Sequence, residues 1–340
     1  MNLTFISDLH LGANRTGGTT QATAYQLRLD LLKQFEELLY TIDTDLCIGG
    51  DLFDGHDISK QDLLRAYHIL DDWLVRTGKD LFLVNGNHDL STNSTNFSSF
   101  QFLAALLKDG GYVGAVHHIT EPTMTPYGYM IPHLPNQDLF NLAMAAVPEC
   151  EYLFVHCNYD NKFAVEKDHS LNMSEEQAKA APVKHIIFAH EHKARRALGG
   201  KVLVVGNQFP SSVADCLETT FKRLLRIDNG EPTFLPTWYA AGDYSEQDWR
   251  ELRDEGRFIR VTGYATAAEA SQVVTAISKF RASAQVLVIT NAVKIEGVND
   301  AAELALSHEE VTSFDVFEAL KEVLTPAEIA KLEKLKEQSC

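Results

Sequence analysis

The sequence predicts an α/β protein in which two β-sheets form a layered sandwich flanked by helices, followed by a small α/β unit and a helical tail. Short apolar runs recur along the chain, and each ends in a polar cluster, which is the pattern of buried strands. Segments with helical spacing separate the first three runs, as in a sheet covered by helices. The later runs follow one another more closely and indicate a second sheet. The expected strands are Leu3–Ser7, Asp45–Gly49, Leu81–Val84, Tyr152–Val155, His185–Phe188 and Lys201–Val205.

The segments between the first three expected strands have the apolar spacing of surface helices. Between residues 25 and 40 the apolar side chains recur at steps of three and four, and the same spacing is found between residues 62 and 75. Each segment would therefore present one apolar face to the sheet.

The chain changes character after about residue 240. Arg257–Gly263 and Val286–Ile295 are predicted strands, and Ala267–Phe280 is a predicted helix between them. We therefore expect three parts, which are a main domain at residues 1–240, a small α/β unit at 243–297 and a helical tail at 298–340.

The tail contains two apolar stripes at helical spacing. The stripes are Phe314, Phe317, Leu320 and Leu324, and then Ile329, Leu332 and Leu335. Thr325 and Pro326 between them have the features of a helix start, with an N-cap residue followed by proline. Two interpretations stay open: the stripes pack on their own domain, or they form a helical hairpin that docks on a partner.

The net charge limits the classes of ligand. Asp and Glu outnumber Lys and Arg by 47 to 30, which gives a formal charge of −17. Nucleic-acid-binding modules are usually basic, because much of their affinity comes from neutralising phosphates. The acidity therefore counts against a stand-alone DNA-binding module, and counts less against an enzyme that holds phosphate through metal ions.

The cysteines and the apolar runs bear on location. Five cysteines are scattered without a C-x-x-C pair, which is typical of reduced thiols in the cytosol. The N-terminal residues lack the features of a signal peptide, and no apolar stretch approaches the roughly 20 residues that span a membrane. We expect a cytoplasmic protein, of a bacterium or of the host cell if a phage encodes it, with no membrane partner.

Five polar motifs follow the expected strands in order. They are Asp8-Leu9-His10, Gly50-Asp51-Leu52-Phe53-Asp54, Gly86-Asn87-His88-Asp89, Val155-His156 and His190-Glu191-His192. Any one of them alone is more often a loop residue than a ligand, but their joint order indicates a metal centre. Because alternate residues of an extended chain point to the same side, Asp8 with His10, and His190 with His192, can face one pocket.

The chemistry of these side chains indicates two metal ions. Carboxylate, imidazole and amide donors suit Mn, Fe or Zn better than Mg. The donors outnumber the ligands of one tetrahedral zinc, and thiolates are absent from the set. Two metals about 3.5–4 Å apart, bridged by a carboxylate, would use all of them, bind phosphate oxygens and stabilise an in-line displacement.

The motifs resemble those of the calcineurin-like metallophosphoesterases over about residues 8 to 192. Within that superfamily the chain resembles the nuclease subunit of the SbcCD type, which includes phage recombination exonucleases. The spacing of the second and third motifs, the segment Val205–Ser212 and the small α/β unit carry this narrower resemblance, although the last hundred residues match only in layout. The resemblance implies a metallophosphoesterase β-sandwich, a capping-type domain at 243–297 and a tail that binds an ATPase through about Ser313–Lys336.

The resemblance also implies two sets of metal ligands joined by Asp51 as the bridge. The sets are Asp8, His10 and His192 for one manganese ion, and Asn87, His156 and His190 for the other. Mg²⁺ or another divalent metal could replace the two Mn²⁺ ions.

Two further motif residues receive roles from the resemblance. His88 would face the scissile phosphate, where it would stabilise the transition state or protonate the leaving oxygen. Alternatively, the His88 side chain stabilises the conformation of its loop and has no catalytic role. Asp89 would orient His88 or brace the loop.

The chain departs from the family pattern at Ala189, where the family usually has glycine before the first histidine of H-x-H. Asp54 and His56 are either loop residues or substrate contacts. Other histidines match no motif and are expected to be structural; they are His68, His117, His118, His133, His169, His185 and His308.

Basic residues cluster at Lys193, Arg195 and Arg196 and again at Lys222, Arg223 and Arg226. The first trio is either a solvated face or a path for a phosphate backbone.

The leading interpretation is a manganese-dependent DNA nuclease subunit. By resemblance it would act as a 3′-to-5′ exonuclease on duplex ends and as an endonuclease on single strands, in DNA repair or recombination. It would form a homodimer. It would also bind an SMC-like coiled-coil ATPase, since the sequence has no G-x-x-x-x-G-K-[ST] loop with which to supply ATPase chemistry itself. The alternatives are a small-molecule or cyclic-nucleotide phosphodiesterase or a protein phosphatase with the same metal site, which the charge of −17 favours, and a non-catalytic scaffold.

Overall fold

The computed structural model describes residues 2–13, 21–90, 96–161, 170–217, 221–239, 243–283 and 288–296. The chain divides into two compact units, Met1–Lys294 and Ile295–Cys340, and the fold described below is that of the first unit. The predicted tail at 298–340, with its expected ATPase contact, lies outside the described residues.

The first sheet has six strands in the order β14-β13-β1-β2-β3-β4. Four of them run parallel: β1 (Asn2–Ile6), β2 (Asp45–Ile48), β3 (Leu81–Val84) and β4 (Val116–Ile119). The hairpin of β13 (Phe221–Asp228) and β14 (Glu231–Tyr239) adds to the other edge, where β13 pairs antiparallel with β1. The three strands expected here are confirmed, and the hairpin extends the sheet beyond the prediction.

The second sheet also has six strands, in the order β11-β12-β10-β7-β6-β5. Its parallel centre consists of β6 (Gly128–Ile131), β7 (Cys150–His156), β10 (Val183–Ala189) and β12 (Val202–Val204). Short antiparallel strands close its edges, namely β5 (Thr123–Thr125) and β11 (Arg195–Ala197). The predicted second sheet is therefore confirmed.

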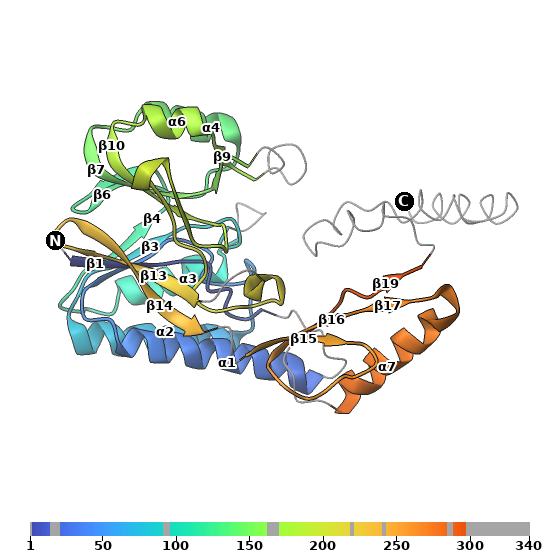
Figure 1. Ribbon diagram of the computed structural model, residues 1–340. Helices are drawn as coiled ribbons and strands as arrows, with labels where there is room; N and C mark the ends of the chain where they lie inside the picture. Colours follow the sequence, from blue (N-terminus) through green and yellow to red (C-terminus); the bar gives the residue numbers. More distant parts are fainter. Residues whose placement is uncertain are drawn as a thin grey trace, which may run out of the picture. The chain divides into compact units, whose positions relative to one another are not determined.

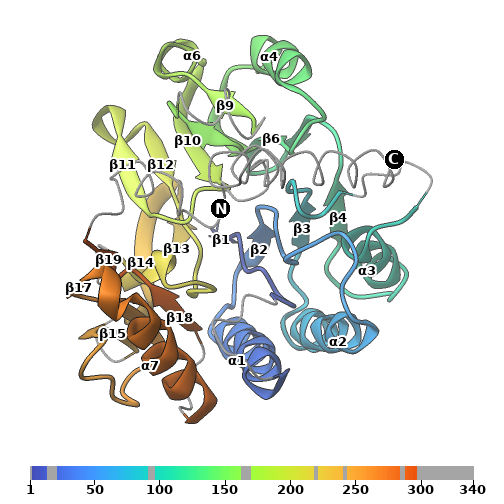
Figure 2. The ribbon, with the colours of Figure 1, turned by 90° about the vertical axis from the view of Figure 1, so that its right-hand side faces the viewer.

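The two sheets stack between two layers of helices (Figures 1 and 2). The helices α1 (Gln21–Tyr40), α2 (Lys60–Thr77) and α3 (Ser99–Lys108) share one buried apolar cluster with the first sheet. The helices α4 (Gln137–Ala145) and α6 (Glu175–Ala180) share another with the second sheet. A third cluster fills the space between the sheets. Because side chains alternate along a strand, Ile48 packs on the helices while Cys47 packs between the sheets. The predicted layered sandwich is confirmed.

A small α/β unit follows the hairpin. Its parallel sheet has the order β15-β16-β18, formed by Tyr244–Asp248, Phe258–Thr262 and Val288–Asn291. The helix α7 (Ala270–Ser283) contributes Val273 and Ile277 to its apolar core. The remaining short elements are β8 (Asn158–Tyr159), β9 (Asn172–Met173), β17 (Tyr264–Ala265), β19 (Lys294–Ile295), η1 (Leu198–Gly200), η2 (Ala214–Cys216) and η4 (Ala267–Glu269).

The predicted strand Val286–Ile295 is wrong in its extent. Strand β18 ends at Asn291, and β19 begins only at Lys294. The Asn291 side chain accepts a hydrogen bond from the backbone of Val293 at 3.1 Å, which is the way asparagine closes a turn. The boundaries 1–240 and 243–297 stay predictions. None of the helices in the described ranges is long and apolar enough to cross a membrane.

The cluster between the sheets is expected to contribute strongly to stability. Phe154 is 1% exposed and stacks on Phe5 with ring centroids 5.7 Å apart. A Phe154→Ala variant should lower the free energy of unfolding by about 3–5 kcal/mol, because it removes buried apolar surface and leaves a cavity. Urea unfolding in the presence of a chelator measures this loss without a contribution from metal. Phe102→Ala on α3, where the side chain is 49% exposed, should change it by less than about 0.5 kcal/mol. Equal losses in the two variants would contradict the assignment of the core.

Candidate metal centre

The five motifs meet at one edge of the stacked sheets. The motif residues follow the carboxyl ends of β1, β2 and β3 in the first sheet, and of β7 and β10 in the second. Ligands of open parallel sheets bind beyond these ends, where the loops diverge. Residues that are far apart in the sequence therefore lie close together. Oδ2 of Asp8 accepts a hydrogen bond at 3.0 Å from the backbone N–H of His190, which is 182 residues later in the chain.

The first candidate metal cluster consists of Asp8, His10 and His192, whose ligand atoms lie within 4.8 Å of one another. The Nε2 atoms of His10 and His192 are 3.0 Å apart. Two nitrogen ligands at right angles around a metal, each about 2.1 Å from it, would be about 3 Å apart. Oδ2 of Asp8 accepts the hydrogen bond from His190, while Oδ1 is buried without a partner. A bound cation would satisfy this oxygen, since buried polar atoms rarely stay unpaired.

The second candidate metal cluster consists of Asp51, His156 and His190. The amide oxygen of Asn87 lies 2.9 Å from Nε2 of His156 and 2.9 Å from Nδ1 of His190. Oδ2 of Asp51 is 3.4 Å from Nε2 of His156. The seven predicted metal ligands are thus gathered into two adjacent groups whose mixed oxygen and nitrogen donors fit divalent transition metals. The identity of the metal and the bridging role of Asp51 stay predictions.

Several ligands have a backbone conformation that side chains other than glycine rarely adopt. The φ angles of Asp8, His10, Asp51 and His190 are 54°, 48°, 51° and 81°. Such residues cost on the order of 1–3 kcal/mol each and persist only when their surroundings hold them. Here the loops after β1 and β2 bind each other, with Asp8 N–H donating to Gly50 O at 3.0 Å and His10 N–H to Asp51 O at 3.1 Å. Hydrogen bonds of the fold itself therefore hold these candidate ligands in place.

Glycine at two motif positions permits this close approach. A Cβ atom on Gly50 would lie 2.3 Å from Nδ1 of His156, and one on Gly86 would lie 2.1 Å from Oδ1 of Asp51. Any side chain at Gly50 or Gly86 would displace His156 or Asp51, which are candidate metal ligands, so only glycine fits at these two positions.

Hydrogen bonds behind the candidate ligands fix the tautomers of two imidazole rings, those of His192 and His156, and a carboxylate faces a third ring, that of His10. Nδ1 of His192 lies 2.8 Å from Oδ1 of Asp215, and Nδ1 of His10 faces Oδ1 of Asp54 at 3.2 Å. Nδ1 of His156 lies 2.9 Å from the main-chain oxygen of Gly49. Because a carboxylate or a carbonyl can only accept, Nδ1 of His192 and Nδ1 of His156 are protonated, and Nε2 of each of these rings faces the candidate metal position. Asp54, predicted as a loop residue or a substrate contact, thus faces a metal ligand, while His56 is exposed.

His88 lies beside the first cluster and is partly exposed. Its Nδ1 donates to the main-chain oxygen of Asp54 at 2.8 Å, which leaves Nε2 as the nitrogen that can exchange a proton with a substrate. Its backbone N–H donates to Oδ1 of Asp51 at 2.9 Å, and its ring stands at 90° to that of His10 with centroids 5.0 Å apart. The ring is therefore oriented from two sides.

Asp89 is buried and ties the two motif loops together. Its Oδ2 accepts from the backbone N–H of Asp51 at 2.7 Å and of Gly86 at 2.9 Å. Burial, together with the negative charge of Asp51, raises the pKa of Asp89 to about 8. Burial would also raise the pKa of Asp51, but the positive charges of His156 and His10 hold it well below its usual range. The centre thus gathers buried groups of both charges, and a bound cation would further stabilise the carboxylates.

Two residues of this centre, Asp215 and Lys222, were not predicted from the sequence. Asp215 had no assigned role. Lys222 belongs to the second basic cluster of the sequence, yet it is 4% exposed and donates to the main-chain oxygen of His192 at 3.0 Å. Its place two residues before the buried Leu224 on β13 is a signal that could have indicated an inward side chain. His133 was expected to be structural, and its ring lies 6.2 Å from that of His156 with the pKa lowered to about 3 by burial and by the charge of His156.

The basic residues after H-x-H make contacts within the protein. Arg195 pairs with the carboxylate of Glu191, and its guanidinium lies 5.9 Å from the ring centroid of Tyr159. Arg196 lies over the ring of Phe234 at 5.1 Å. These two side chains therefore support the H-x-H loop and its neighbours, and a path for a phosphate backbone along them stays a prediction.

The departure from the family pattern at Ala189 is accommodated in the fold. Ala189 is the last residue of β10, pairs in register with His156, and packs in the apolar cluster between the sheets. Its methyl group therefore occupies core space and leaves both histidines of H-x-H in place.

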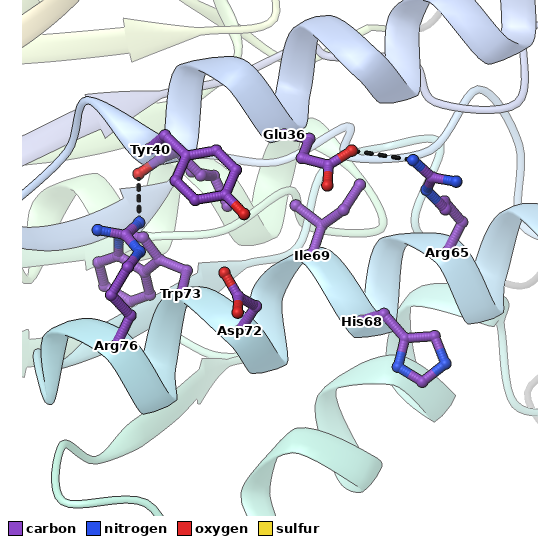
Figure 3. Close-up of a pocket in the computed structure, with 9 residues that line it drawn as sticks. Glu36, Tyr40, Arg65, His68, Ile69, Asp72, Trp73 and Arg76 are labelled. Atoms are coloured by element: carbon purple, nitrogen blue, oxygen red, sulfur yellow. Dashed lines mark hydrogen bonds and ion pairs between the residues drawn. The ribbon is translucent and has the colours of Figure 1, made fainter.

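A separate hollow lies on the surface between α1 and α2 (Figure 3). Its volume is about 270 Å³, and its lining includes Glu36, Arg65, Trp73 and Arg76. The guanidinium of Arg65 pairs with Glu36 at 2.9 Å, and that of Arg76 donates to the main-chain oxygen of Leu39 at 2.9 Å. Both guanidinium groups are thus already paired within the protein, and no lining residue of this hollow belongs to either metal cluster, so we assign the chemistry to the metal centre.

The layered fold and the two donor clusters define the protein as a hydrolase of the two-metal class. The chain belongs to the calcineurin-like phosphoesterase family, whose model matches residues 1–194 of the 340 and so includes both clusters. A comparison with curated proteins gives no match to the chain. The predicted superfamily is confirmed, and the protein is a metal-dependent phosphoester hydrolase. The narrower SbcCD-type resemblance stays a prediction.

Proposed function

We propose that this phosphoesterase is a manganese-dependent DNA nuclease subunit. It acts as a 3′-to-5′ exonuclease on duplex ends and as an endonuclease on single strands. It works as a homodimer in a DNA repair or recombination complex with an SMC-like coiled-coil ATPase. Phosphoester hydrolysis follows from the family to which the chain belongs. The proposal adds the DNA substrate, the identity of the metal and the partners.

The observation that carries the proposal is the arrangement of His88 beside two complete donor clusters. Two divalent ions bound there would supply Lewis-acid activation of a phosphodiester and of the attacking water. The donors fit such ions because an orphaned carboxylate oxygen of Asp8 and convergent imidazole nitrogens point to common positions. Since Nδ1 of His88 is committed to Asp54, Nε2 is the atom that can deliver a proton to the leaving oxygen. A diester needs this proton because an alkoxide is a poor leaving group.

Two features bear on the choice between DNA and a small substrate. The small α/β unit with its own apolar core follows the phosphoesterase layers, and it supports a macromolecular substrate that extends beyond the metal centre. The net charge of −17 favours the second candidate function, a small-molecule or cyclic-nucleotide phosphodiesterase or phosphatase. In the DNA nuclease the ATPase subunit would supply the missing basic surface.

Digestion of end-labelled linear duplex DNA tests the proposal. We expect the purified chain to release nucleotides with Mn²⁺ and much more slowly with Mg²⁺, and to cut single-stranded circular DNA under the same conditions. The Asn87→Ala variant should lose both activities, because the Asn87 amide oxygen lies 2.9 Å from two ligand nitrogens. Asn141→Ala, which changes an exposed amide on α4, should keep them. Turnover of an aryl phosphodiester without cleavage of either DNA, alone or with an added ATPase subunit, would overturn the nuclease in favour of the small-substrate enzyme.

A further inference from the structure

Asp215 is a buried carboxylate that neither the motifs nor the family match includes. It lies on η2, 23 residues beyond His192, and is 6% exposed. Its Oδ1 accepts a hydrogen bond from Nδ1 of His192 at 2.8 Å. The opposite nitrogen of that ring, Nε2, faces Nε2 of His10 in the first cluster at 3.0 Å. Asp215 thus acts on the metal position through His192.

The second oxygen of Asp215 is anchored by the preceding turn. Oδ2 accepts from the backbone N–H groups of Ser211 and Ser212, both at 2.9 Å, and from the Ser211 hydroxyl at 3.1 Å. With one oxygen held by three donors, the carboxylate has little freedom to rotate, and the other oxygen stays directed at His192. The Asp215 carboxylate therefore holds the His192 ring in a fixed orientation, which a solvent-exposed ion pair between mobile side chains would not do.

A buried cation accompanies this buried carboxylate. The ammonium group of Lys222 donates to the main-chain oxygen of His192 at 3.0 Å, so the histidine is held at both its ring and its backbone. A buried charge is costly unless it is paired and hydrogen-bonded, and Asp215 meets both conditions.

We propose that Asp215 is a positioning residue for the metal ion bound by Asp8, His10 and His192. It holds His192 in the tautomer and ring orientation that present Nε2 to the ion. Without it, the ring could carry its proton on Nε2 or turn about its bond to Cβ, and each change would remove a ligand. The inference rests on the two-metal centre and does not depend on whether the substrate is DNA.

The effect should be confined to one of the two ions. In the second cluster His156 is backed by the main-chain oxygen of Gly49 at 2.9 Å, and Asn87 supplies its amide oxygen directly. No contact of Asp215 with these groups is found among the described residues. Loss of Asp215 should therefore weaken the first ion and leave the second unchanged.

Titration of the metal-free chain with Mn²⁺ alone tests the inference. We expect two equivalents in the wild type, and in Asp215→Ala a loss of about 10–100-fold in affinity for one of them. Asp215→Asn should lose less, because it keeps an acceptor oxygen and loses the charge. Substituted Co²⁺ should report the change as an altered visible spectrum of one ion. Asp80→Ala is the control, since Asp80 also accepts a backbone N–H and faces a histidine, His117, 3.7 Å away.

Double variants assign the weakened ion. His156→Ala should leave one equivalent, that of the first cluster, and adding Asp215→Ala should weaken this remaining equivalent. His10→Ala should leave the equivalent of the second cluster, and adding Asp215→Ala should not change it.

The outcomes distinguish a failure of the inference about Asp215 from a failure of the metal centre on which it rests. Wild-type affinity for both ions in Asp215→Ala and Asp215→Asn would overturn the inference and leave the centre intact. If Asp215→Ala fails to fold, Asp215→Asn with its unchanged shape decides. A wild-type chain that binds no divalent metal would overturn the centre itself, and the inference with it.

Discussion

An Asp51→Asn variant is expected to lose nearly all phosphodiester hydrolysis together with at least one metal ion. Asp51 is 1% exposed and is the only anion in the cluster it forms with His156 and His190. Asparagine keeps the size and one acceptor oxygen but removes the negative charge that a divalent ion requires in a buried site. The loss of several kcal/mol of transition-state stabilisation corresponds to a fall in turnover on the order of 10⁴-fold. Turnover of an aryl phosphodiester and metal content by mass spectrometry measure the two effects.

Asp45→Asn provides the matched control, because Asp45 lies on β2 and Asp51 lies in the loop that follows this strand. Asp45 begins β2, at the opposite end from Asp51, and accepts hydrogen bonds from the backbone of Asp80 at 3.0 Å and from the Tyr127 hydroxyl. Its asparagine variant should keep full activity and both ions. An Asp51→Asn protein that retained two ions and its turnover would remove Asp51 from the metal centre.

A His88→Ala variant should lose activity in proportion to how poor the leaving group is. If Nε2 of His88 protonates the leaving oxygen, its removal should slow DNA cleavage by about 10²–10⁴-fold. Cleavage of a nitrophenyl phosphodiester should slow far less, because nitrophenolate leaves without a proton. The ring belongs to neither metal cluster, so both ions should remain bound. Rates on the two substrates and metal content from the same preparation check all three expectations.

His68→Ala is the control for the removal of an imidazole. His68 is exposed on α2, beside the hollow between the helices, and its loss should leave both rates unchanged. Equal slowing of both substrates in His88→Ala would exclude protonation of the leaving group and would favour stabilisation of charge on the phosphate. Loss of metal in that variant would indicate the bracing role weighed against catalysis.

The central strands of both sheets and their ligands were predictable because local sequence determines them. Every residue of Leu81–Val84 is buried, so an unbroken apolar run can be recognised without knowledge of its neighbours. The positions of the candidate ligands could be predicted because the loops after parallel strands all begin at the same edge of the sheet, where ligands bind. The alternation that paired Asp8 with His10 rested on extended backbone, yet both residues have positive φ. They converge because the loops after β1 and β2 bind each other, which sequence periodicity does not reveal.

Other parts of the fold depend on contacts between distant segments. The edge strands Thr123–Thr125 and Arg195–Ala197 are short and partly polar, and they are strands because β6 and β12 pair with them. Asp215 lies in a short 3₁₀ turn with no periodic signal. It becomes part of the centre through a hydrogen bond across 23 residues. Such a partner can be found only when the chain is folded.

The different supports behind the two clusters have a consequence for protein engineering. His192 and His10 are backed by side chains, those of Asp215 and Asp54, which can be exchanged one at a time. His156 is backed by the main chain of Gly49, which no exchange of side chain can remove, and a Cβ atom at Gly49 would lie 2.1 Å from Phe5 Cζ. A graded series of variants can therefore change the donor strength of two imidazoles at one ion while the His156 donor at its neighbour stays constant. An ion bound at the second cluster would then serve as an internal standard within each molecule.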